Sequence, residues 1–143
     1  RLDKAEINQR IQSLGLNSTE LSRLHFDAKA QDKGLENRVS AEDMRLLLSL
    51  LYDGKLVNTQ ASNQMLNILK NQRLNGKMPF FLHGVPIAHK TGEDDGISHD
   101  VGIVYASEPF VVCFLSEETD VPSFERWIQD TTFLLANASS HKK

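Results

Sequence analysis

The apolar residues of this chain change their spacing once, near residue 80. Upstream, Met44, Leu47, Leu48 and Leu51 recur at the three- and four-residue spacing of a helix. Downstream, residues 85–90 alternate between two sides, with the period of two that is typical of a β-strand. A helical half followed by a strand-rich half predicts an α+β fold.

Three helices are predicted before the change, at about 3–14, 40–53 and 59–72. The first begins with a capping box, because Asp3 is followed three residues later by Glu6, and Ser40 with Asp43 repeats this arrangement in the second. The polar residues 17–39 connect these two helices. A connection of this length in a compact domain is usually functional or mobile.

Three strands and a last helix are predicted after the change. Short connections join the strands into an antiparallel meander, at about 84–90, 99–106 and 109–115. Within the first strand, Lys90 should face away from the side of Ile87. A helix at about 122–137 follows, and we expect one of its faces to cover the sheet. That face is made of Phe124, Trp127, Ile128, Thr131 and Leu135.

The predicted strand at 109–115 is apolar on both faces, as is typical of a strand with neighbours on both sides. The sequence supplies only one neighbour for it. Because a free apolar edge is a template for aggregation, we expect a missing N-terminal segment, or a second chain, to pair with this strand. Residues 1–143 are therefore predicted to form a single partial domain.

Composition argues against several classes of function. The net charge is −3 and the basic residues are scattered, so nucleic-acid binding is not expected. No run of about 18 apolar residues is present, so membrane insertion is not expected.

Cys113 lies in an apolar run and is interpreted as a small buried hydrophobic residue. The five histidines lack the spacing of metal ligands, and we expect no metal or other cofactor.

The strand-rich half contains a more specific pattern. An apolar strand ends in Lys90-Thr91-Gly92, and the strand "HDVGIVY", an apolar strand and an amphipathic helix follow. This pattern resembles the C-terminal part of class A β-lactamases and penicillin-recognising serine hydrolases. Upstream, residues 39–69 resemble the two helices after the omega loop of that family, and residues 20–39 fall where that loop is expected. The resemblance implies a β-lactamase/transpeptidase-like fold over nearly the whole chain.

The resemblance also implies roles for four consecutive residues. Lys90 would attract the carboxylate of a small-molecule substrate and favour the anionic species of acyl transfer. The Thr91 hydroxyl would donate a hydrogen bond to the same carboxylate, and Gly92 would let the ligand lie close to the strand. The backbone N–H of Glu93 would serve in the oxyanion hole, where one donor contributes roughly 3 kcal/mol in the transition state.

The family's nucleophile is absent from this chain. It belongs to a Ser-x-x-Lys motif, and a Ser-x-Asn motif accompanies it, but neither can be assigned. No lysine follows three residues after Ser22, Ser40, Ser49 or Ser62. We therefore expect the chain to be a C-terminal fragment that is inactive by itself.

The omega-loop region also departs from the family. Class A β-lactamases hold the deacylating water with a Glu-x-x-x-Asn pair, which residues 17–39 lack. Asp27 is a candidate base, and the alternative is a carboxylate that holds the loop together by hydrogen bonds. Adjacent strand residues point to opposite faces, so His99 and Asp100 are not expected to form a catalytic dyad.

Two functions remain open at this stage. The first is a fragment of a β-lactamase-like serine hydrolase, acting on a β-lactam or a related amide or ester. The second is a binding or structural module that has kept the fold and lost the chemistry. A location outside the cytoplasm, in the cell envelope or beyond it, is implied by the resemblance alone.

Overall fold

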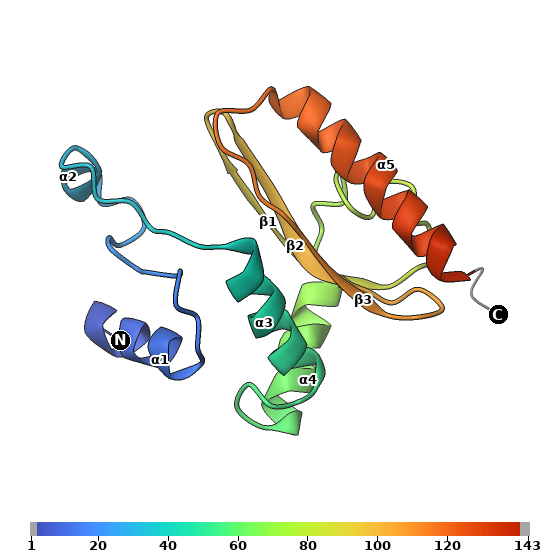
Figure 1. The fold of residues 1–143 in the computed structure, drawn as a ribbon, viewed down its shortest axis with the longest axis horizontal. Coiled ribbons are helices and arrows are strands. Elements are labelled where there is room, and N and C mark those ends of the chain that lie inside the picture. The colour runs from blue at the N-terminus through green and yellow to red at the C-terminus, as the bar shows by residue number, and fades with distance from the viewer. Residues whose placement is uncertain (1–2, 141–143) are drawn as a thin grey trace. The chain divides into compact units, whose positions relative to one another are not determined.

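The computed structural model describes residues 3–140 of the chain (Figure 1). The chain divides into two compact units, residues 1–47 and 48–143, and the boundary falls within helix α3 (Ala41–Tyr52). Each unit has its own internal organisation, so each is described separately.

The first unit contains α1 (Lys4–Ser13), the short α2 (Ala28–Gln31) and the beginning of α3. The predicted capping box is confirmed, because the Asp3 carboxylate accepts the Glu6 N–H at 2.8 Å and the Glu6 carboxylate accepts the Asp3 N–H at 3.0 Å. The Ser40 hydroxyl accepts the Asp43 N–H in the same way. The buried Asp43 carboxylate points elsewhere and accepts hydrogen bonds from the connection between α1 and α3.

That connection is closed at its base by backbone and side-chain hydrogen bonds. Glu20 and Arg38 exchange both backbone hydrogen bonds at 3.0 Å, as two residues of an antiparallel ladder do. The Asn8 side chain both donates to and accepts from the Leu21 backbone. The Asn37 amide oxygen accepts two N–H groups, from Ser22 and from the next residue along the chain. Side chains of this one unit therefore hold the connection in place.

The second unit is a three-stranded antiparallel sheet between two helical layers. The strands are β1 (Ile87–Asp94), β2 (Ile97–Val104) and β3 (Phe110–Phe114), in the order β1-β2-β3. The end of α3 and α4 (Thr59–Lys70) contribute Leu48, Leu51 and Leu66 to the core on one face. Helix α5 (Val121–Ser140) covers the other face (Figure 1). The predicted α+β meander with a covering helix is confirmed.

The bounds of β1 and β2 differ from the prediction. β1 begins at Ile87, directly after a proline, and continues to Asp94, so the Lys-Thr-Gly tripeptide lies inside the strand and does not end it. The turn consists of Asp95 and Gly96, whose φ of 65° is a conformation that glycine adopts without strain. β2 starts immediately after this turn, two residues earlier than predicted.

The face of α5 that covers the sheet is also rotated relative to the prediction. Ile128, Thr132 and Ala136 are buried, because they follow one another at the four-residue spacing of a single helix face. Trp127 and Leu135, which were expected on that face, are 53% and 42% exposed. Trp127 still contacts the sheet, since its ring packs edge-on against Phe114 at a centroid distance of 5.4 Å.

β3 lies at one edge of the sheet, and among the described residues it pairs with β2 alone. Four of its five residues are partly exposed, and Cys113, expected to be buried, is among them. The additional neighbour expected for this apolar strand therefore stays a prediction.

The close approach of β1 and β2 at Gly102 gives a direct test of this register. A Cβ atom at Gly102 would lie 2.6 Å from the Ala88 carbonyl oxygen and 3.0 Å from the His89 Cα. We expect Gly102→Ala to lower the free energy of unfolding by about 2 kcal/mol or more, measured by urea denaturation. Gly76→Ala is the matched control, because a Cβ there meets no atom within 4 Å. Equal stability of the two variants would contradict the register.

Candidate functional site

The backbone of β1 presents a row of polar groups at the open edge of the sheet. The Tyr105 N–H donates to the Pro86 carbonyl at 3.0 Å, and hydrogen-bonded pairs alternate with non-bonded pairs along an antiparallel ladder. The Gly92–His99 pair is therefore hydrogen-bonded, and the following pair, Glu93–Ser98, is not. Consequently the Glu93 N–H points away from β2, toward an edge where the described residues place no further strand.

The side chains of Lys90 and Thr91 lie on opposite faces of β1. Lys90 is exposed on the face of Ala88, as predicted, and its ammonium group donates to the Thr91 carbonyl. Because Thr91 belongs to a non-bonded pair, that carbonyl points to the open edge, and the ammonium group lies there too. Thr91 is buried on the face of Ile87.

Gly92 makes room for the imidazole ring of its cross-strand partner His99. A Cβ atom at Gly92 would lie 3.3 Å from the His99 Cδ2. The His99 Nδ1 accepts the Ser116 N–H at 3.1 Å, so the neutral ring carries its proton on Nε2. Burial of the ring, and then the positive charge of Lys77, lower the pKa of His99 below its ordinary value. This imidazole therefore stands beside the Lys-Thr-Gly backbone on the face of Lys90.

A buried His–Asp pair lies under the same strand. His89 and Asp100 are 1% and 0% exposed, and the His89 Nδ1 lies 2.8 Å from one Asp100 carboxylate oxygen. The other oxygen accepts the Met78 N–H at 3.0 Å. As predicted, Asp100 does not form a dyad with its neighbour His99, because the two point to opposite faces. The pair instead connects both strands of the hairpin to the segment that precedes β1.

Lys77 is a buried cation at the turn end of the sheet. Its side chain is 4% exposed and lies 3.2 Å from the Glu93 carboxylate and 3.6 Å from the Glu125 carboxylate. The ammonium group also lies 3.2 Å from the His99 carbonyl oxygen and 3.5 Å from that of Gly92. Four acceptors thus surround three N–H donors, which compensates the charge in a buried position.

The sequence interpretation missed both Lys77 and the His89–Asp100 pair. Lys77 lies between the predicted helix at 59–72 and the predicted strand at 84–90, and nothing in its local sequence separates it from an exposed lysine. The pair was accessible in principle, because a turn placed at Asp95–Gly96 brings positions 89 and 100 onto the same face as diagonal neighbours. The predicted strands left residues 91–98 as a connection that was too long, and this hid the signal.

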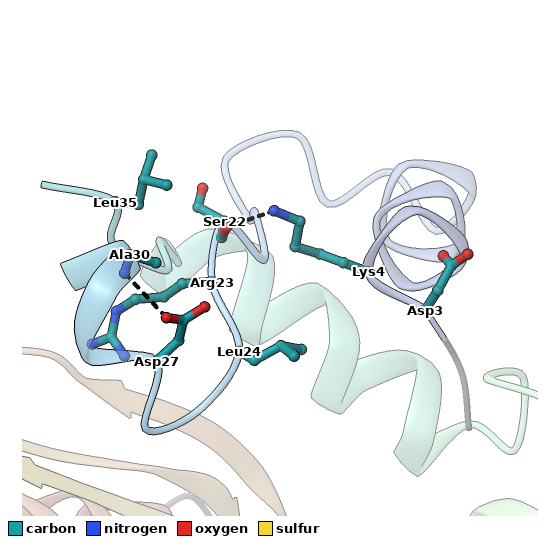
Figure 2. Close-up of a pocket in the computed structure, with 8 residues that line it drawn as sticks. All are labelled: Asp3, Lys4, Ser22, Arg23, Leu24, Asp27, Ala30 and Leu35. Atoms are coloured by element: carbon teal, nitrogen blue, oxygen red, sulfur yellow. Dashed lines mark hydrogen bonds between the residues drawn. The ribbon is translucent and has the colours of Figure 1, made fainter. Parts of the chain in front are cut away.

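Asp27, the candidate base, lies in the first unit (Figure 2). One of its carboxylate oxygens accepts the Ala30 N–H at 3.1 Å and so caps α2. It lines a cavity of about 490 Å³ together with Leu24 and Leu35. Phe26, the residue before Asp27, has a backbone φ of 63°, and its side chain is 89% exposed. One carboxylate oxygen of Asp27 therefore has a structural role, because it caps α2.

The chain matches a known family model over most of its length. The model is described as the β-lactamase enzyme family, and it matches residues 1–137. No curated protein sequence matches the chain significantly.

Several solved structures have a similar fold. A β-lactamase from Sphaerobacter thermophilus is 23% identical with a TM-score of 0.81, and the match covers 96% of this chain and 54% of that one. PBP-A is 23% identical with a TM-score of 0.83, and the match covers 96% and 51%. A β-lactamase from Chitinophaga pinensis is 24% identical with a TM-score of 0.78, covering 95% and 55%. The chain thus spans about half the length of these structures.

The buried Asp100 carboxylate can be tested by two substitutions. Asp100→Ala leaves the Met78 N–H and the His89 Nδ1 without their acceptor, and we expect it to lower the free energy of unfolding by about 3–5 kcal/mol. Asp100→Asn should cost clearly less, because the amide can accept from Met78 and donate to the other tautomer of His89. Urea denaturation followed by Trp127 fluorescence measures both variants, and equal losses would contradict these hydrogen-bond assignments.

The lowered pKa of His99 predicts the sign of one pH effect. Because the unfolded chain binds this proton more readily, the group reduces stability as the pH falls below the unfolded pKa of about 6.5, until the folded pKa is reached. We expect an NMR titration of the His99 ring to have its midpoint below 6.5. In Lys77→Met the midpoint should rise, since a nearby positive charge is removed. A midpoint at or above 6.5 in the unaltered protein would refute this assignment.

Proposed function

Because the chain belongs to the β-lactamase enzyme family, we propose that it supplies one wall of the active site of a serine hydrolase, the wall formed by β1. The substrate is a β-lactam or a related amide or ester that carries a carboxylate. The observation that carries this proposal is the arrangement at the open edge of β1. There the Lys90 ammonium group and the outward-pointing N–H of Glu93 lie along one strand, next to the side-chain-free Gly92.

In this proposal each group has a distinct part in acyl transfer. Lys90 supplies the positive charge that attracts the substrate carboxylate and stabilises the anion formed during attack. The Thr91 hydroxyl donates a hydrogen bond to the same carboxylate, which requires the buried side chain to be reached past the strand edge. The Glu93 N–H donates to the developing oxyanion, and the absence of a side chain at Gly92 lets the substrate approach the backbone.

We further propose that a segment outside this chain completes the protein. The chain spans about half the length of the similar structures, and no Ser-x-x-Lys motif precedes β1 in its sequence. That segment would contribute the serine nucleophile, and it, or a second chain, would also pair with the open edge of β3. An apolar strand with a neighbour on one side supports this proposal.

One observation favours a second function, a non-catalytic binding module. Residues 17–39 contain no Glu-x-x-x-Asn pair, and Asp27, the nearest candidate base, caps a helix. Without a base to activate water, an acyl-enzyme would persist and the protein would act as a penicillin-binding protein and not as a β-lactamase. A protein that has lost the acylation step as well would be the non-catalytic binding module.

The proposed site of action is the cell envelope or the extracellular space. None of the helices described between residues 3 and 140 is long and apolar enough to cross a bilayer. The proposal of location rests on the family, whose substrates are cell-wall precursors and antibiotics. Antibiotic resistance would follow only if the acyl-enzyme is hydrolysed.

Covalent labelling by a fluorescent penicillin tests the proposed function. We expect the full-length protein to be labelled on a serine outside this chain, and Lys90→Ala to lower the labelling rate at least about tenfold, because a charge-assisted contact to the substrate is lost. Lys55→Ala is the matched control, since Lys55 forms an exposed ion pair with Asp53. No adduct in the presence of a Ser-x-x-Lys motif would favour the binding module. A serine adduct on the 143-residue chain alone would refute the proposal that a segment outside this chain contributes the nucleophile.

A further inference from the structure

The peptide unit between Gly92 and Glu93 has its two polar ends on opposite sides of β1. Gly92 belongs to a hydrogen-bonded pair, so its carbonyl points toward β2. Glu93 belongs to the following non-bonded pair, so its N–H points to the open edge. Both groups are part of a single planar amide. A positive charge near the Gly92 carbonyl oxygen therefore also changes the polarity of the Glu93 N–H, because both groups belong to one conjugated amide.

Lys77 lies at the carbonyl end of this amide. Its ammonium nitrogen is 3.5 Å from the Gly92 carbonyl oxygen and 3.2 Å from the His99 carbonyl oxygen, the two acceptors of one ladder pair. A carbonyl oxygen has two lone pairs, so it can accept from the ladder and from Lys77 together. The lysine side chain is 4% exposed, and an electrostatic contact in such a poorly solvated position is stronger than it would be in water.

We propose that Lys77 is a positioning residue that polarises the Gly92–Glu93 amide and so makes the Glu93 N–H a stronger donor. This inference rests on the proposed function, in which that N–H binds the oxyanion. A positive charge at the carbonyl oxygen draws electron density from the amide nitrogen, and hydrogen bonds in series strengthen one another by about 10–30%. Applied to an oxyanion donor whose removal lowers the rate about 10²- to 10³-fold, this corresponds to a change of about two- to tenfold in the acylation rate.

The carboxylates beside Lys77 weaken its polarisation of the amide, so the proposal predicts the direction of change when one of them is neutralised. Glu125 lies on α5, 3.6 Å from the ammonium nitrogen, and also accepts the Ser98 hydroxyl. Its negative charge attracts the ammonium group away from the two carbonyls. Removing that charge, while keeping the hydrogen bond, should therefore strengthen the polarisation. A purely structural ion pair would instead be weakened by any substitution of either partner.

Pre-steady-state acylation by penicillin measures the consequence for the reaction. In the full-length protein, we expect Lys77→Met to lower the acylation rate constant about two- to tenfold with little change in the apparent dissociation constant of the substrate. Lys77→Arg should restore most of the rate, because the charge returns. Glu125→Gln should leave the rate unchanged or raise it. Lys55→Met, which removes an exposed charge of the same sign, is the matched control.

An NMR signal of the amide itself tests the inference without any reaction. Glycine precedes glutamate once in residues 1–143, at Gly92–Glu93, so labelling with carbonyl-¹³C glycine and ¹⁵N glutamate gives one correlated signal from these residues. We expect the Glu93 amide proton to move upfield in Lys77→Met, to return in Lys77→Arg, and to move downfield in Glu125→Gln. Urea denaturation of each variant identifies loss of rate that follows only from loss of stability.

The outcomes separate the inference from the function on which it rests. If the unaltered protein is not acylated, the proposed function fails, and the amide signal alone decides whether Lys77 polarises this peptide. If acylation occurs but neither the rate nor the amide signal responds to Lys77→Met, the inference is overturned and the function stands. A rate loss in Lys77→Met that Lys77→Arg does not restore, or an equal loss in Glu125→Gln, also overturns it in favour of a structural ion pair.

Discussion

An antiparallel hairpin with a two-residue turn leaves no choice in which residues face one another, and the candidate site follows from this constraint. With Asp95 and Gly96 in the turn, the pairing of β1 with β2 is set along its whole length. The pairing decides that the Glu93 N–H points to the open edge and that the Gly92 carbonyl points to β2. A shift of one residue would reverse both directions and would also exchange the faces of Lys90 and Thr91.

Much of this architecture could be predicted because several local signals agree. The capping box at Asp3, the apolar stripe that contains Leu48 and Leu51, and the alternation after residue 84 each indicate one element, and the structure contains all of them. The resemblance carried by Lys90-Thr91-Gly92 was confirmed at the level of family and fold. The roles of these residues stay predictions, because they concern a substrate and a nucleophile outside the chain.

The errors have physical causes that local patterns do not contain. The predicted strand ended at Lys90 because the charged residues after Gly92 are more typical of a turn, yet cross-strand pairing continues to Asp94. Trp127 was expected on the face that covers the sheet because of its helical spacing from the other apolar residues, whereas the position of α5 on the sheet exposes about half of it. Lys77 could not be recognised, since its partners Glu93 and Glu125 lie far along the sequence and meet it only in the folded unit.

The closure of the connection between α1 and α3 has a consequence for how that segment can vary. Glu20 and Arg38 form a ladder pair, and the side chains of Asn8 and Asn37 flank it. We call this closed base the neck, and residues 24–36 form a loop beyond it. The entropic cost of closing a loop grows only slowly with its length. Insertions and replacements beyond the neck can therefore change what this segment presents, while the neck keeps its two ends fixed within the first unit.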